Sequence, residues 1–170
     1  MPPLLDVYIL TRERNIETLN QFLDLYVDRE ASMDRGDEEL MILPRDCVTA
    51  PKEFDEWEWT PALNLKSMIW KGLDYPRRAF TIYLTPAYKN IERVIVAFTQ
   101  DDQLILGVSI EDEEKSDANL ELAKSFLHQL ANNFNGIEGF IAWEEPPPIL
   151  QAEFSSHSQN IYMWRHIEPN

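Results

Sequence analysis

Carboxylates next to tryptophans are the side chains of this sequence that could do chemistry. Residues 53–61 read EFDEWEWTP, so Trp57 and Trp59 stand among four carboxylates. Paired carboxylates perform the acid and base steps of glycoside hydrolysis, and tryptophan rings offer a large apolar face to a ligand. In a strand, the carboxylates of this segment would be divided between both faces, which favours an exposed or partly exposed element. Such an element can equally serve as an interface, because tryptophan anchors are typical of binding hot spots.

Two further carboxylate groups occur later in the chain. Glu144 and Glu145 are adjacent, and together with segment 53–61 they are the candidates for a hydrolytic pair. Glu111 to Glu114 read EDEE just before an expected helix, where carboxylates gain from the helix dipole. The EDEE spacing lacks the alternating ligands and central glycine of an EF-hand loop. We therefore expect no metal at this run.

Signatures of other catalytic and cofactor-binding sites do not occur. The three histidines, His128, His157 and His166, do not have the spacing of zinc ligands. The single cysteine, Cys47, could meet a distant histidine in the fold, but nothing specific in the sequence supports such a pair. No serine elbow and no glycine-rich phosphate loop is found among the 5 glycines. The sequence therefore predicts no metal site and no cofactor, and it favours binding over catalysis.

The charge of the chain restricts its partners. Its 170 residues carry a formal net charge of −15. Affinity for nucleic acid depends on Lys and Arg neutralising phosphates, so we expect no direct binding to nucleic acid. The same field attracts basic proteins and accelerates their encounter, although acidity also serves solubility alone. One cysteine cannot form an internal disulfide, and no apolar run reaches the roughly 20 residues that span a bilayer, so we expect a cytoplasmic protein outside the membrane.

Hydrophobic periodicity predicts the elements that position these residues. Alternation indicates strands over residues 4–11, 39–44, 79–86, 92–99, 104–111, 139–144 and 160–167. Helical spacing indicates helices over residues 15–31, capped by Asn15, and over residues 116–136, capped by Ser116 or Asp117. Residues 59–72 fit both periods, and we favour a short helix that begins at Thr60 and Pro61 and ends at Gly72.

This order of elements is typical of one α+β domain over residues 1–170. We expect a single mainly antiparallel sheet, with residues 79–111 as a meander and two principal helices packed on one face. The prolines of EEPPP end the strand over residues 139–144. Residues 146–170 are expected to add a strand to the same domain, and the alternative is an arm exchanged with another subunit.

We therefore expect a non-enzymatic, inhibitor-like or immunity-like acidic protein that binds a basic protein partner. Its predicted contact residues form two groups: Asp55, Glu56, Trp57, Glu58 and Trp59, with Glu111, Asp112, Glu113 and Glu114 as a patch that steers the partner. One alternative is a carboxylate-dependent hydrolase or small-ligand enzyme. The other is a structural or regulatory subunit of an oligomer that uses the C-terminal segment.

Overall fold

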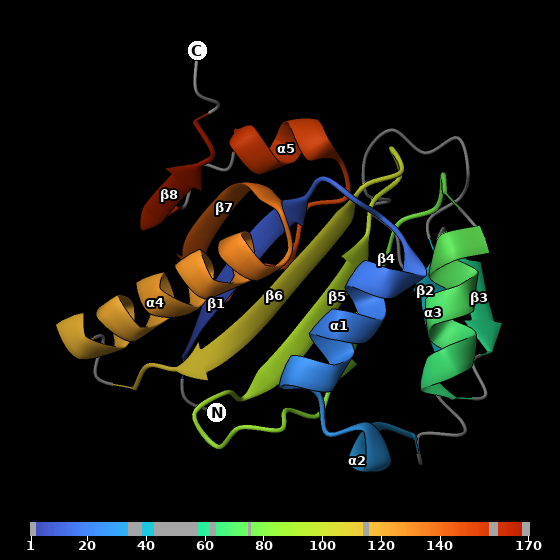
Figure 1. Cartoon of the computed structure of the whole chain (residues 1–170), viewed down its shortest axis with the longest axis horizontal. Helices are drawn as coiled ribbons and strands as arrows, with labels where there is room; N and C mark the ends of the chain where they lie inside the picture. Colours follow the sequence, from blue (N-terminus) through green and yellow to red (C-terminus); the bar gives the residue numbers. More distant parts are fainter. Residues whose placement is uncertain are drawn as a thin grey trace.

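The fold follows the predicted order of elements, with some shifted boundaries. The computed structural model describes residues 3–33, 39–42, 58–61, 64–74, 76–113, 116–156 and 160–167 (Figure 1). Along the chain the elements are β1 (Leu4–Thr11), α1 (Ile16–Tyr26), α2 (Arg29–Met33), β2 (Glu39–Ile42), β3 (Glu58–Pro61), α3 (Leu65–Asp74), β4 (Phe80–Leu84), β5 (Arg93–Phe98), β6 (Leu104–Glu111), α4 (Asp117–Asn133), β7 (Gly136–Trp143), α5 (Gln151–Ser155) and β8 (Tyr162–Arg165).

The main sheet has six strands in the order β4-β5-β6-β1-β7-β8. All of its neighbouring pairs are antiparallel, which confirms the predicted α+β class. β4, β5 and β6 form the predicted meander. The described part of the chain also contains a small sheet of two strands, β2 and β3.

One face of the main sheet is covered by helices and holds the larger core (Figure 1). The strand residues that point to this side alternate along each strand, as Val7 and Ile9 do in β1. α1 and α4 cover this face as predicted, and Phe22 of α1 meets Phe134 with ring centroids 5.4 Å apart. α3 adds a third helix through Leu65, Met68 and Ile69.

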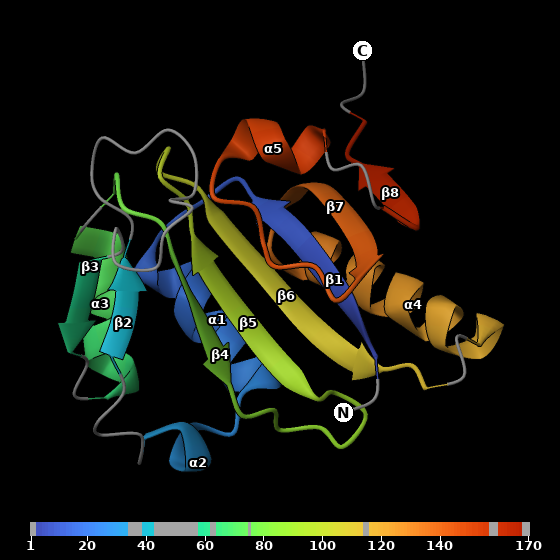
Figure 2. The ribbon, with the colours of Figure 1, turned by 180° about the vertical axis from the view of Figure 1, so that it is seen from behind.

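The opposite face carries a smaller core under α5, a helix that the sequence does not predict (Figure 2). Phe154 of α5 is fully buried and packs on Phe140 of β7, with ring centroids 4.8 Å apart. β8 then pairs with β7 in antiparallel register, so the segment after the prolines joins the main sheet. Exchange of this segment between subunits stays a prediction.

Capping side chains set the helix boundaries. The side-chain oxygen of Asn15 accepts a hydrogen bond from the Thr18 backbone N–H (2.8 Å), which confirms the predicted cap of α1. Ser116 caps α4 in the same way. The prediction for α3 is wrong at both ends: Thr60 and Pro61 belong to β3, and the helix runs past Gly72 to Asp74.

Two local contacts explain the shift of α3. Asn64 accepts a hydrogen bond from the Ser67 backbone N–H (2.9 Å), so the helix starts after Asn64. Gly72 lies inside the helix, and a Cβ atom there would clash with the ring of Phe98, so the position requires glycine. The glycine thus serves helix–sheet packing and does not end the helix.

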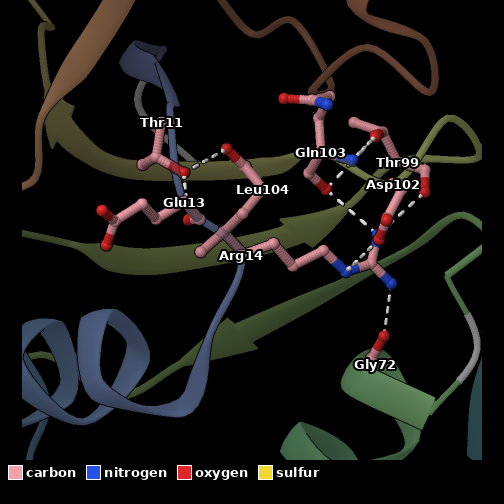
Figure 3. Close-up of polar contacts among 8 residues, drawn as sticks. All are labelled: Thr11, Glu13, Arg14, Gly72, Thr99, Asp102, Gln103 and Leu104. Carbon is pink, nitrogen blue, oxygen red and sulfur yellow. Dashed lines mark hydrogen bonds and ion pairs between the residues drawn. The ribbon is translucent and has the colours of Figure 1, made fainter.

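A buried arginine ties three parts of the fold together (Figure 3). The side chain of Arg14 is only 5% exposed and lies over the ring of Phe98, with Cζ 5.0 Å from the ring centroid. Its guanidinium donates hydrogen bonds to three backbone carbonyl oxygens, those of Thr99, Gln103 and Gly72. Arg14 therefore links the loop before α1 to the β5–β6 turn and to α3, which is a structural role.

Candidate functional site at the acidic end of the sheet

The central strands bring several carboxylates to one end of the sheet. β1 begins where β6 and β7 end, because Leu4 lies opposite Glu111 and Leu5 lies opposite Trp143. Five residues at this point, which we call the acidic end, are Glu111, Glu113, Trp143, Glu144 and Glu145. All but Glu145 are exposed, and Glu145 is partly buried.

Asp112 at the acidic end is an internal residue. It is 1% exposed, and its carboxylate accepts hydrogen bonds from the Ser116 backbone N–H (3.1 Å), the Asn119 amide (2.8 Å) and the Trp143 indole N–H (3.1 Å). A carboxylate at the start of α4 satisfies amide groups that the helix itself leaves unpaired. Asp112 therefore does not belong to an exposed patch, which the sequence prediction had assumed.

Trp143 is an exposed aromatic side chain in a fixed position. It is 41% exposed although it lies at the end of a central strand. Its indole N–H donates a hydrogen bond to the buried carboxylate of Asp112, so the ring is held in one orientation. The sequence analysis did not include Trp143, although the string WEE after an apolar strand is a usable signal.

A small pocket opens at the acidic end, on the sheet face opposite α1 and α4. Its volume is about 220 Å³. The described residues that line it are Leu4, Asp6, Tyr8, Tyr83, Arg93, Glu144, Glu145 and Pro146. The pocket thus holds three carboxylates and one guanidinium, so its lining is predominantly negative.

Two side chains of β1, those of Asp6 and Tyr8, form hydrogen bonds with the backbone of Glu145 in the wall of this pocket. The carboxylate of Asp6 accepts a hydrogen bond from the Glu145 backbone N–H (3.0 Å), and another from the Ser109 hydroxyl. The Tyr8 hydroxyl donates to the Glu145 carbonyl oxygen (2.6 Å). Both backbone groups of Glu145 are therefore fixed to β1.

Burial changes the ionisation of Asp6. The residue is 6% exposed, and desolvation raises its pKa from 3.8 to about 6. Hydrogen bonds from Ser109 and Glu145 and the charge of Arg93 lower this pKa, but burial outweighs them. A perturbed carboxyl group beside a pocket is a recognised mark of functional sites.

Glu144 holds an unusual backbone conformation at the mouth of the pocket. Its φ of 50° lies in the left-handed region, which costs a non-glycine residue on the order of 1 kcal/mol. Its backbone N–H donates to the Leu4 carbonyl oxygen (3.1 Å), and Glu145 with its hydrogen bonds to β1 follows directly. These contacts hold the turn that carries both glutamates.

The other predicted group of contact residues lies elsewhere. Asp55, Glu56 and Trp57, and likewise Glu114, lie outside the described residues. Glu58 and Trp59 belong to β3, which pairs with β2, and β2 contacts β4 at the far edge of the main sheet (Figure 2). The structure thus places Glu58 and Trp59 apart from Glu111 and Glu113, and their binding roles stay predictions.

Sequence reasoning also missed Asp6, Tyr8 and Arg93. Asp6 is a single charged residue inside the apolar strand LLDVYILT, which is a signal that the sequence does contain. Its partners could not be read from the sequence, because Glu145 is 139 residues away.

Wider searches add no assignment. Among the described residues, no group of three or more His, Cys, Asp and Glu side chains could hold a metal ion. No described helix has the length and apolar character needed to cross a membrane. Comparison with protein-family models, curated proteins and solved structures finds no match to this chain.

Proposed function

We propose that this protein is a non-enzymatic binding protein whose acidic end engages a basic protein partner. The observation that carries the proposal is Trp143, a half-exposed indole that buried Asp112 holds in place at the same end of the sheet as exposed carboxylates. An aromatic anchor with a fixed rotamer loses little entropy on binding. Carboxylates at the rim accelerate the encounter with a basic surface.

The pocket beside Glu144 and Glu145 supports the same proposal. Its volume of about 220 Å³ lies below the roughly 300–1,000 Å³ of most small-molecule sites, so one side chain of a partner suits it better than a larger ligand. The ionised carboxylates outnumber Arg93 in the lining, which favours a lysine or arginine side chain as the guest. Trp57 and Trp59 remain the predicted second contact group.

Capture from lysate of the source cells tests the proposal if it is done with charge-matched variants. One bait carries Glu111→Gln and Glu113→Gln, and its control carries Glu17→Gln and Asp74→Asn, two exposed carboxylates on α1 and α3. Both baits lose the same charge. We expect a basic protein that is retained by wild type and by the control, and that is lost or reduced on the acidic-end bait. Equal retention on both baits would show that the positions of the carboxylates do not matter and would contradict the assignment of the site.

The second candidate is a carboxylate-dependent hydrolase, which the raised pKa of Asp6 in a pocket with Glu144 and Glu145 favours. A carboxyl group of this kind can hold the proton that a general acid needs. The test compares wild type and Asp6→Asn on a panel of chromogenic glycosides and esters. Hydrolysis by wild type that Asp6→Asn abolishes would replace the binding proposal.

A further inference from the structure

A second and larger pocket lies between α1 and α3, away from the acidic end. Its volume is about 410 Å³, which is within the range of small-molecule sites. The described residues that line it are Ile16, Asn20, Leu23, Arg29, Asn64, Leu65, Lys66, Ile69 and Trp70.

The walls of this pocket are mainly apolar. Leu23, Leu65 and Ile69 line the pocket, although they belong to the main core and are at most 4% exposed. Trp70 forms an open side of the pocket and is 46% exposed, which makes it one of the larger apolar side chains left in water. An apolar guest would remove this surface from solvent, at about 25 cal/mol per Å².

The charged groups of this pocket have the opposite sign to those at the acidic end. Arg29 and Lys66 line it, and no carboxylate is among the described lining residues, in a protein of net charge −15. Asp24 pairs with Arg29 (2.7 Å) outside the lining, so one positive charge is partly balanced. The Asn20 carbonyl oxygen also accepts from this guanidinium (3.3 Å). Nε of Arg29 is buried and has no hydrogen-bond partner among the described residues.

From these features we propose that the pocket between α1 and α3 binds a small amphiphile with an apolar tail and an anionic head group. The tail lies along Leu65, Ile69 and Trp70, and the head lies between Lys66 and Arg29. Charge complementarity favours an anionic head group. The protein as a whole is acidic and repels anions, whereas the positive side chains of this lining attract an anion. The inference does not depend on the basic partner, since the two sites share no residue.

Calorimetric titration with three probes that share a ten-carbon chain tests the inference on the full chain. Decanoate carries the expected head, decyltrimethylammonium carries the opposite charge, and decanol is neutral. All are used below their aggregation limits at about pH 8, where the carboxylate is ionised. We expect saturable binding of one decanoate per chain, with decyltrimethylammonium about ten-fold weaker.

Two charge reversals provide the matched control. Lys66→Glu should weaken decanoate about five-fold or more, whereas Lys89→Glu, an exposed residue outside the lining, should leave it unchanged. Far-ultraviolet circular dichroism confirms that both variants are folded. Absence of decanoate binding, equal affinity for all three probes, or equal effects of the two reversals would each overturn the proposal.

Discussion

In the folded protein, the carboxyl group of Asp6 stays protonated at pH values above those at which an aspartate ordinarily ionises. Because burial raises its pKa from 3.8 to about 6, the folded chain binds this proton more tightly than the unfolded chain does. The protonated Asp6 therefore contributes to the free energy of unfolding. This contribution is fully present below pH 3.8, the pKa of Asp6 in the unfolded chain, and it is lost as pH rises through about 6. Between about pH 5.3 and pH 8 the loss amounts to about 1 kcal/mol.

The Asp6→Asn variant isolates this effect from the many other carboxylates. Asparagine can still accept from the Glu145 N–H, and it can donate to the Ser109 hydroxyl, but it does not titrate. We expect its unfolding free energy in urea, relative to wild type, to rise by about 1 kcal/mol from about pH 5.3 to pH 8. A difference that stays constant with pH would show that Asp6 has an ordinary pKa.

Arg14 gives a second prediction for a single residue. A lysine at this position keeps the charge but cannot reach three carbonyl oxygens at once, and it loses the stacking on Phe98. We expect Arg14→Lys to lower the unfolding free energy by about 2 kcal/mol. Arg77→Lys, at an exposed site, should change it by less than about 0.5 kcal/mol. Equal and small effects in urea denaturation would show that the network is not stabilising.

Among the elements, α3 depends on one close contact with the sheet. Gly72→Ala would normally stabilise a helix by about 1 kcal/mol, but the new methyl group meets the ring of Phe98. We expect a net loss of about 1–3 kcal/mol in thermal or urea unfolding. The smaller side chain of Phe98→Leu should recover part of that loss in the double variant. A single variant as stable as wild type would mean that α3 can shift without cost.

Elements with strong periodicity could be predicted from the sequence, and contacts between distant residues could not. The alternation in Leu4–Thr11 and the capped stripe of Asp117–Asn133 gave β1 and α4 nearly in full. The start of α3 was misplaced because Thr60 and Pro61 imitate a helix start, whereas Asn64 supplies the actual cap. α5 is only five residues long and leaves too few turns to show a period.

The candidate site follows the same rule. Glu111 and Glu113 were found because a charge run before a helix is visible in sequence. The internal role of Asp112 depends on its contact with Trp143, which is 31 residues away. The hydrogen bonds between β1 and Glu145 join residues that are far apart in the sequence, so only the folded structure shows them.

For the whole molecule, the net charge of −15 should accelerate the encounter with the proposed basic partner. Salt screens this attraction, so the association rate constant of wild type should fall steeply as ionic strength rises. The double variant Glu111→Gln and Glu113→Gln should associate more slowly and depend less on salt. Stopped-flow or surface-based kinetics at two salt concentrations measures both quantities.

The most direct test of the acidic end is the kinetics of Trp143→Ala with the captured partner. If Trp143 lies at the contact as we propose, its loss should raise the dissociation rate constant about ten-fold or more and leave the association rate constant nearly unchanged. Urea denaturation of the same variant verifies that the fold persists without the indole bond to Asp112. If a folded Trp143→Ala variant releases the partner at the wild-type rate, the partner does not bind at the acidic end.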